Sequence, residues 1–116
     1  MIFIKVGIIF CMLSVIIGAF GAHSLKDIIS DKKDIFQTGV QYQIFHGFAL
    51  IITGILHKIL NINLNMAGYF FISGIIIFSG TLFLISIYKY SFLGAITPIG
   101  GVLFIIGWIF LFYKIM

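Results

Sequence analysis

The chain contains no arginine and no glutamate, and it has few charged side chains of any kind. Only 9% of its 116 residues are charged, whereas 62% are hydrophobic and the mean hydropathy is +1.27. A soluble domain has roughly 25% charged and about 45–50% apolar residues. Because so little charge could not cover a core for water, we expect an integral membrane protein, and the length fits one domain.

Other scarce residues exclude several chemistries. The single cysteine, Cys11, rules out an internal disulfide and a paired-thiol redox centre. All three carboxylates lie in residues 27–34, so the apolar runs lack the buried acid on which small four-span proton-coupled transporters depend. His46, the histidine deepest in an apolar run, has no neighbouring cysteine or carboxylate, and we expect no metal or other cofactor. These absences favour a protein that is not an enzyme.

The positive charge is spread along the chain. Seven lysines produce a net charge of +4, and they lie near the ends of the apolar runs. This spread is typical of membrane anchoring and argues against nucleic-acid binding. Three lysines fall on the side of the two termini and four on the other side, as judged from the four runs described below. Since lysine is enriched on the cytoplasmic side, this balance favours, by a small margin, termini outside the cell.

Four apolar runs are each long enough to cross a bilayer as a helix, which takes about 20 residues. They predict an all-α bundle of four transmembrane helices with both termini on one side. The expected spans are about 3–22, 36–58, 66–88 and 92–113.

The polar segment 23–34 separates the first two spans. Within it Leu25, Ile28 and Ile29 have helical spacing, which predicts a short helix lying in the membrane interface. Asp34 is expected to cap the second span as part of a variant capping box.

The segment Phe36–Leu50 carries more hydrogen-bonding side chains than any other apolar stretch. Such groups need partners in a bilayer, so this helix is expected at the centre of the bundle. The favoured interpretation is a hydrogen-bonded clamp between helices, and the alternative is a polar path for a transported solute. The candidate buried polar cluster comprises Gln41, Tyr42, Gln43, His46 and Thr97.

Small residues recur at distances that place them on common helix faces, which favours close helix packing. Pro98 removes a backbone donor, and we expect it to kink a continuous fourth helix; the alternative is a helix that starts there with Thr97 as N-cap. The expected packing positions are Gly18, Ala22, Gly39, Gly47, Gly80, Gly94, Pro98 and Gly101.

Four motifs together resemble the domain of unknown function 423 family, also called uncharacterised protein family 0382. The resemblance covers nearly the whole chain and implies a small four-span protein of the bacterial inner membrane with no assigned activity. It brings no catalytic or ligand-binding residue. The motifs are GAFGAH at 18–23, FQTGVQYQIFHGFAL at 36–50, GIIIFSGTLF at 74–83 and LGAITPIGGVLFIIGW at 93–108.

These observations predict a non-enzymatic structural or accessory membrane component. The alternative function is a small channel or transporter whose path is lined by the second span. Membrane lipids are expected to surround the protein, which would associate with itself or with a larger membrane complex. A solute cavity reaching His46 would favour transport, whereas direct hydrogen bonds from Gln43 and His46 to other helices would favour the structural role.

Overall fold

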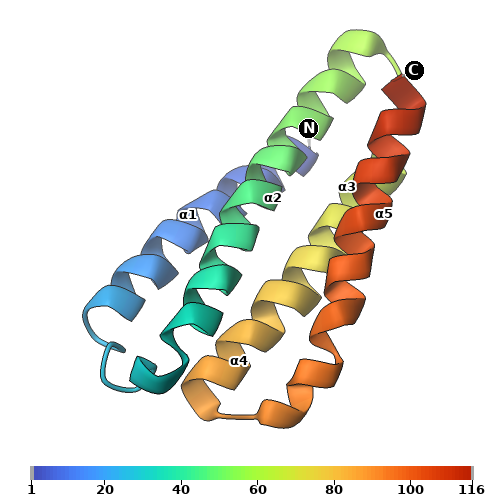
Figure 1. Cartoon of the computed structure of the whole chain (residues 1–116). Helices are drawn as coiled ribbons and strands as arrows, with labels where there is room; N and C mark the ends of the chain where they lie inside the picture. Colours follow the sequence, from blue (N-terminus) through green and yellow to red (C-terminus); the bar gives the residue numbers. More distant parts are fainter. Residues whose placement is uncertain (1, 116) are drawn as a thin grey trace.

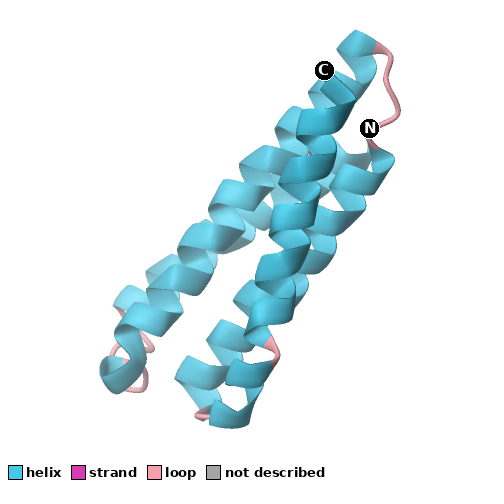
Figure 2. Cartoon of the chain, turned by 45° about the vertical axis from the view of Figure 1, so that its right-hand side comes forward, coloured by secondary structure: helices cyan, strands magenta, loops and turns pink. Residues whose placement is uncertain are grey.

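The computed structural model describes residues 2–115, which are helical along almost their whole length and contain no strand (Figure 2). Three long rods are α1, α2 and α5, and the fourth is a continuous helix made of α3, the π-helical segment η2 and α4. Two short 3₁₀ turns, η1 and η3, precede α2 and α5. The bounds are α1 Ile2–Ala22, η1 Ser30–Lys32, α2 Lys33–Leu60, α3 Asn65–Gly74, η2 Ile75–Ser79, α4 Gly80–Tyr88, η3 Ser91–Ala95 and α5 Thr97–Ile115.

The four rods run up and down in a flattened bundle of 48 × 26 × 17 Å, with the two chain ends at the same end of the bundle (Figure 1). Each rod is long and apolar enough to cross a membrane. The predicted all-α bundle of four transmembrane helices is therefore confirmed. The two ends of the bundle are called here the terminal end and the loop end, the latter holding η1 and η3.

The helix α2 occupies the middle of the bundle. It packs against α1 on one side and against the α3–η2–α4 rod on the other, while α5 packs against α3 and η2. Leu50 of α2 and Phe71 of α3 are fully buried and belong to the main apolar core together with Phe104 of α5. This arrangement leaves α1 in contact chiefly with α2, so most of its surface is free for lipid.

The segment between α1 and α2 differs from the sequence-based expectation. Residues 23–29 form turns, and η1 is a single 3₁₀ turn, so there is no α-helix of the predicted kind across 23–34. Ile29 is only 2% exposed because the turns fold back over the helix ends. Burying this one side chain, instead of laying three on the membrane surface, explains the failure of the interfacial-helix prediction.

The start of α2 also differs. The helix begins at Lys33 and has no side-chain cap, so the capping role predicted for Asp34 is wrong. Asp34 is already inside the first helical turn, where its backbone carbonyl accepts a hydrogen bond from the Thr38 hydroxyl at 2.8 Å.

The region around Pro98 corrects another expectation. The fourth span is not one kinked helix, because η3 ends at Ala95 and α5 begins at Thr97. Pro98 therefore lies in the first turn of α5, where its missing N–H leaves no hydrogen bond unmade. The Thr97 hydroxyl does not cap this helix; it contacts the Thr81 hydroxyl and the carbonyl of Leu93.

Glycines bring α1 and α2 into backbone contact near the terminal end. A Cβ atom on Gly7 would lie 2.6 Å from the carbonyl oxygen of Gly47, and one on Gly54 would lie 2.5 Å from the Ile4 side chain. A Cβ on Gly47 would in turn lie 2.7 Å from the Cys11 sulfur. Only glycine permits this approach, so these positions set the separation of the two helices.

The predicted packing positions have different surroundings. Gly39 and Gly47 are buried against neighbouring helices, while a Cβ placed on Gly18 or Gly101 would make only ordinary van der Waals contacts. Nothing lies within 4 Å of a Cβ placed on Gly80 or Gly94, and Ala22 and Pro98 are exposed, so these four positions do not support close packing. Spacing shows which residues share a helix face, but it does not show whether another helix covers that face.

Candidate buried polar cluster

His46 of α2 is buried where its side chain meets α3 and α5. Its Nδ1 atom lies 2.8 Å from the backbone carbonyl oxygen of Tyr42, to which it donates. Its Nε2 atom accepts a hydrogen bond from the indole N–H of Trp108 on α5 at 3.0 Å. One nitrogen donates and the other accepts, which is the pattern of a neutral imidazole with both nitrogens satisfied.

Aromatic rings enclose this imidazole. The Phe104 ring stacks on it with centroids 3.6 Å apart, and the Tyr42 ring lies nearly parallel at 6.0 Å. The Trp108 ring approaches edge-on, and Phe71 packs against both His46 and Trp108. A histidine in apolar surroundings is costly unless its polar atoms are paired, and here the pairing and the packing come from different helices.

Gln43, one turn before His46, forms the corresponding link to α1. Its side-chain amide donates to the backbone carbonyl of Phe10 at 3.0 Å, and Gln43 is only 4% exposed. The same carbonyl accepts the hydroxyl of Ser14 at 2.8 Å. Together, Gln43 and His46 connect the central helix to α1 on one side and to α5 on the other.

Two further hydrogen bonds join the rods. The Ser79 hydroxyl, at the end of η2, donates to the Gly39 carbonyl at 2.7 Å, and the Thr81 and Thr97 hydroxyls lie 2.7 Å apart. A π-helical segment widens the helix and shifts the direction of the side chains that follow it, which is consistent with Ser79 turning toward α2. Every buried side-chain nitrogen and oxygen of the described residues has a hydrogen-bond partner.

The candidate residues named from the sequence do not form one cluster. Gln43 and His46 are buried and connect α2 to helices on its opposite sides. Gln41 is exposed, and Tyr42 is 39% exposed. Thr97 lies apart, paired with Thr81. Gln41 points away from this face because successive helix residues point in directions 100° apart. Tyr42, four residues before His46, shares the face of the histidine, and its ring packs against the imidazole although the residue as a whole is exposed.

Sequence reasoning missed the partners Trp108, Ser79 and Thr81. A tryptophan near the end of an apolar run is typical of a membrane-interface anchor, but the N–H of Trp108 donates to the buried histidine. The signal that could have found it is that a tryptophan N–H inside an apolar helix needs an acceptor. The sequence offers few acceptors at such depth, and His46 is one of them.

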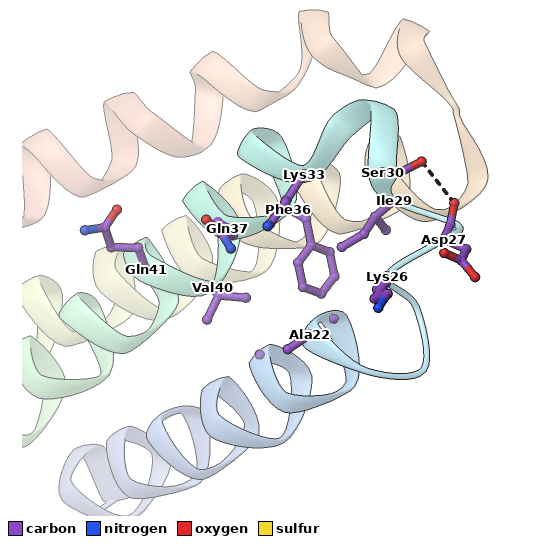
Figure 3. A pocket seen from close by; sticks show the side chains of 12 residues that line it. Ala22, Lys26, Asp27, Ile29, Ser30, Lys33, Phe36, Gln37, Val40 and Gln41 are labelled. Atoms are coloured by element: carbon purple, nitrogen blue, oxygen red, sulfur yellow. Dashed lines mark hydrogen bonds between the residues drawn. The ribbon is translucent and has the colours of Figure 1, made fainter.

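Two cavities lie at opposite ends of the bundle, and His46 lines neither. The larger, of about 890 Å³, opens between α1 and α2 at the loop end (Figure 3). The smaller, of about 420 Å³, is formed by the α2–α3 loop around His57 and Asn61. The ring of His57, in the last turn of α2, accepts a hydrogen bond from the backbone N–H of Leu64 at 3.1 Å and so ties the loop to the helix.

An ion pair ties the two loops at the loop end. The Lys89 ammonium lies 2.5 Å from the Asp31 carboxylate and 2.8 Å from the carbonyl oxygen of Ile28. The hydrogen bond from Lys89 holds the pKa of the Asp31 carboxyl below its ordinary value. Lys89 reaches the first loop because it ends α4 in the left-handed conformation, with φ 62°.

Comparison with known proteins places the chain among small membrane proteins. Residues 17–101 match the family model described as "Protein of unknown function (DUF423)". The "UPF0382 membrane protein" of Staphylococcus epidermidis is 46% identical over 111 residues, covering 95% of this chain and 91% of the relative. The "UPF0382 membrane protein YwdK" of Bacillus subtilis is 45% identical over 111 residues, covering 93% and 90%.

No solved structure matches the chain. The relatives are named as membrane proteins and come from bacteria, and the four rods described above are long enough to cross a bilayer. The chain is thus a multi-pass bacterial membrane protein, and it belongs to the DUF423 family of proteins of unknown function.

Proposed function

We propose that this protein is a non-enzymatic structural or accessory component of the membrane, whose bundle is held together by the polar side chains of α2. The observation that carries the proposal is the complete pairing of His46. A catalytic or transport histidine needs a nitrogen available to a substrate or to water, and both nitrogens of His46 are engaged within the bundle.

The surroundings of His46 support the same conclusion. Phe104 stacks directly on the imidazole, and neither cavity is lined by His46. Among residues 2–115, no three histidine, cysteine or carboxylate side chains come close enough to hold a metal ion. The alternative function, a channel or transporter lined by α2, would require a water-filled pathway past the aromatic rings that pack on His46.

An accessory role also requires a partner, and α1 offers the surface for one. Its outward face carries large exposed apolar side chains, including Ile8, Met12 and Val15. Lipid covers such a face in the monomer, and a second copy or a larger membrane protein would cover it in a complex. Association of this kind belongs to the proposal.

The test uses protein reconstituted into vesicles that contain a pH-sensitive dye. We expect the proton and potassium permeability of these vesicles to equal that of protein-free vesicles. We expect His46→Leu to leave the permeability unchanged and to lower the melting temperature in detergent, because the histidine holds helices together.

The opposite pattern would reject the structural role. It consists of a flux well above that of empty vesicles, abolished by His46→Leu in a variant that melts at the parent's temperature. Such a result would establish the transport alternative, because the histidine would then be needed for passage and not for stability.

A further inference from the structure

The larger cavity is a groove between the end of α1 and the start of α2. Its walls are Gly18, Gly21 and Ala22 on α1 and Phe36 and Val40 on α2, with Ile29 at its end (Figure 3). A Cβ on Gly21 would collide with the Phe36 ring, so this ring stands between the helices at that level. The part of the groove nearest the middle of the bundle is therefore apolar and lies at the depth of the lipid acyl chains.

Two glutamines run along α2 beside this apolar wall. Gln37 and Gln41 line the groove and are exposed, and neither amide makes a hydrogen bond within residues 2–115. From Lys33 to Gln41 the helix rises eight residues, or about 12 Å, so the two amides lie at successive depths below the lysine. Exposed amides are costly against hydrocarbon but favourable against the ester carbonyls and hydroxyls of a lipid.

Charged groups stand at the mouth of the groove. Lys26 and Lys33 line it and are exposed, and Asp27 is the one carboxylate among its lining residues. The neighbouring Asp31 is already paired with Lys89. The lining residues therefore carry a net positive charge, placed where the polar turns meet the apolar wall.

We propose that this groove binds one anionic glycerophospholipid, with its phosphate between Lys26 and Lys33, its ester region against Gln37 and Gln41, and an acyl chain along Gly18 and Val40. The order of chemistry along the groove carries this assignment. Cation, amide and hydrocarbon follow one another in the same sequence as phosphate, ester and acyl chain in the lipid. The surface of a second copy of this chain is not expected to present anionic, ester-like and apolar groups in that order.

The test is native mass spectrometry of the detergent-solubilised full chain, titrated with phosphatidylglycerol, phosphatidylcholine or inorganic phosphate. We expect one phosphatidylglycerol per chain, weaker phosphatidylcholine and no retained phosphate. The double variant Lys26→Gln/Lys33→Gln should bind phosphatidylglycerol more weakly by about fivefold for each lysine, the effect of a lysine at an anionic lipid surface.

A matched control removes the same charge elsewhere. Lys5→Gln/Lys58→Gln changes two lysines near the terminal end and should leave phosphatidylglycerol binding unchanged. Asp27→Asn should tighten binding, because it removes the carboxylate at the mouth and leaves the hydrogen bond from the Ser30 hydroxyl to the Asp27 backbone carbonyl in place. Opposite signs for the lysine and aspartate variants are hard to obtain from any cause except a local anionic ligand.

A third variant tests the acyl chain. Ala22→Leu narrows the groove from an exposed position and should weaken both lipids, while the lipid-free melting temperature stays at that of the parent. Equal binding of phosphatidylglycerol to the parent and to the two-lysine groove variant would overturn the proposal. A lipid-free dimer abolished by Ala22→Leu would also overturn it, because a second copy would then fill the groove.

Discussion

The two ends of the α1–α2 pair are built differently. Near the terminal end, Gly7, Gly47 and Gly54 allow the two helices to approach closely, with the Gly7 Cα beside the Gly47 carbonyl. About 21 Å along α1, at Gly21, a phenylalanine ring stands between the same two helices and the 890 Å³ groove opens.

The difference shows how one pair of helices can serve two purposes. Backbone contact through glycine maximises van der Waals attraction, which is the main force between helices in lipid, where the hydrophobic effect does not drive association. An aromatic spacer gives up part of that attraction and leaves room for another molecule. The closed end is thus the tightly packed part of the pair, and the open end holds the groove for which we propose a lipid.

The largest expected effect comes from forcing the closed end apart. In Gly7→Ala the new methyl group would meet the Gly47 carbonyl and the backbone of Ile51, which cannot move aside as a side-chain tip can. We expect a loss of roughly 1–3 kcal/mol in the free energy of unfolding, the usual cost of overpacking. Unfolding in mixed detergent micelles measures it.

The matched control is Gly80→Ala, since nothing lies within 4 Å of the Cβ it would create. Replacing a helical glycine by alanine without a clash should stabilise the protein by roughly 0.5–1 kcal/mol. If both variants destabilise the protein equally, the contrast between a packed and an open glycine is wrong.

The next effect concerns the hydrogen bond between α2 and α5, from Trp108 to His46, which lies outside the α1–α2 pair. Trp108→Phe keeps an aromatic ring against Phe71 but removes the donor to His46, and it should cost about 0.6–2 kcal/mol. The double variant with His46→Leu should cost less than the sum of the two single variants, since both remove the same hydrogen bond. Strict additivity in this cycle would show that the bond contributes nothing.

The smallest effect is expected at the open end, where Asp31 and Lys89 join two loops on the surface. Because the folded-state pKa of Asp31 is lowered, its charge stabilises the fold above the carboxyl's unfolded pKa, and this contribution disappears as pH falls through the folded pKa. The melting temperature of the parent should exceed that of Lys89→Gln slightly at neutral pH. The two melting temperatures should converge in acid. If they still differ there, the difference has a cause other than the ion pair.

Particular residues show how far the sequence could lead. The runs of apolar residues were sufficient to predict four membrane helices, because a bilayer requires both length and hydropathy from each span. The glycines are harder: Gly7 and Gly54 lie in close contacts between α1 and α2 but are not among the predicted packing positions, whereas Gly80 is among them and a Cβ placed on it would meet no other helix. The spacing of the glycines shows which of them share a helix face. It does not show whether another helix packs against that face.

Composition and the order of polar and apolar residues alone determined that the chain is a multi-pass membrane protein and that its second span is the most polar. The tertiary structure decided which of those polar groups are paired. The bond from Trp108 to His46 joins residues 62 apart, and the bond from Gln43 to Phe10 joins residues 33 apart. Contacts over such separations depend on how each helix is rotated about its axis, which packing sets and local sequence does not.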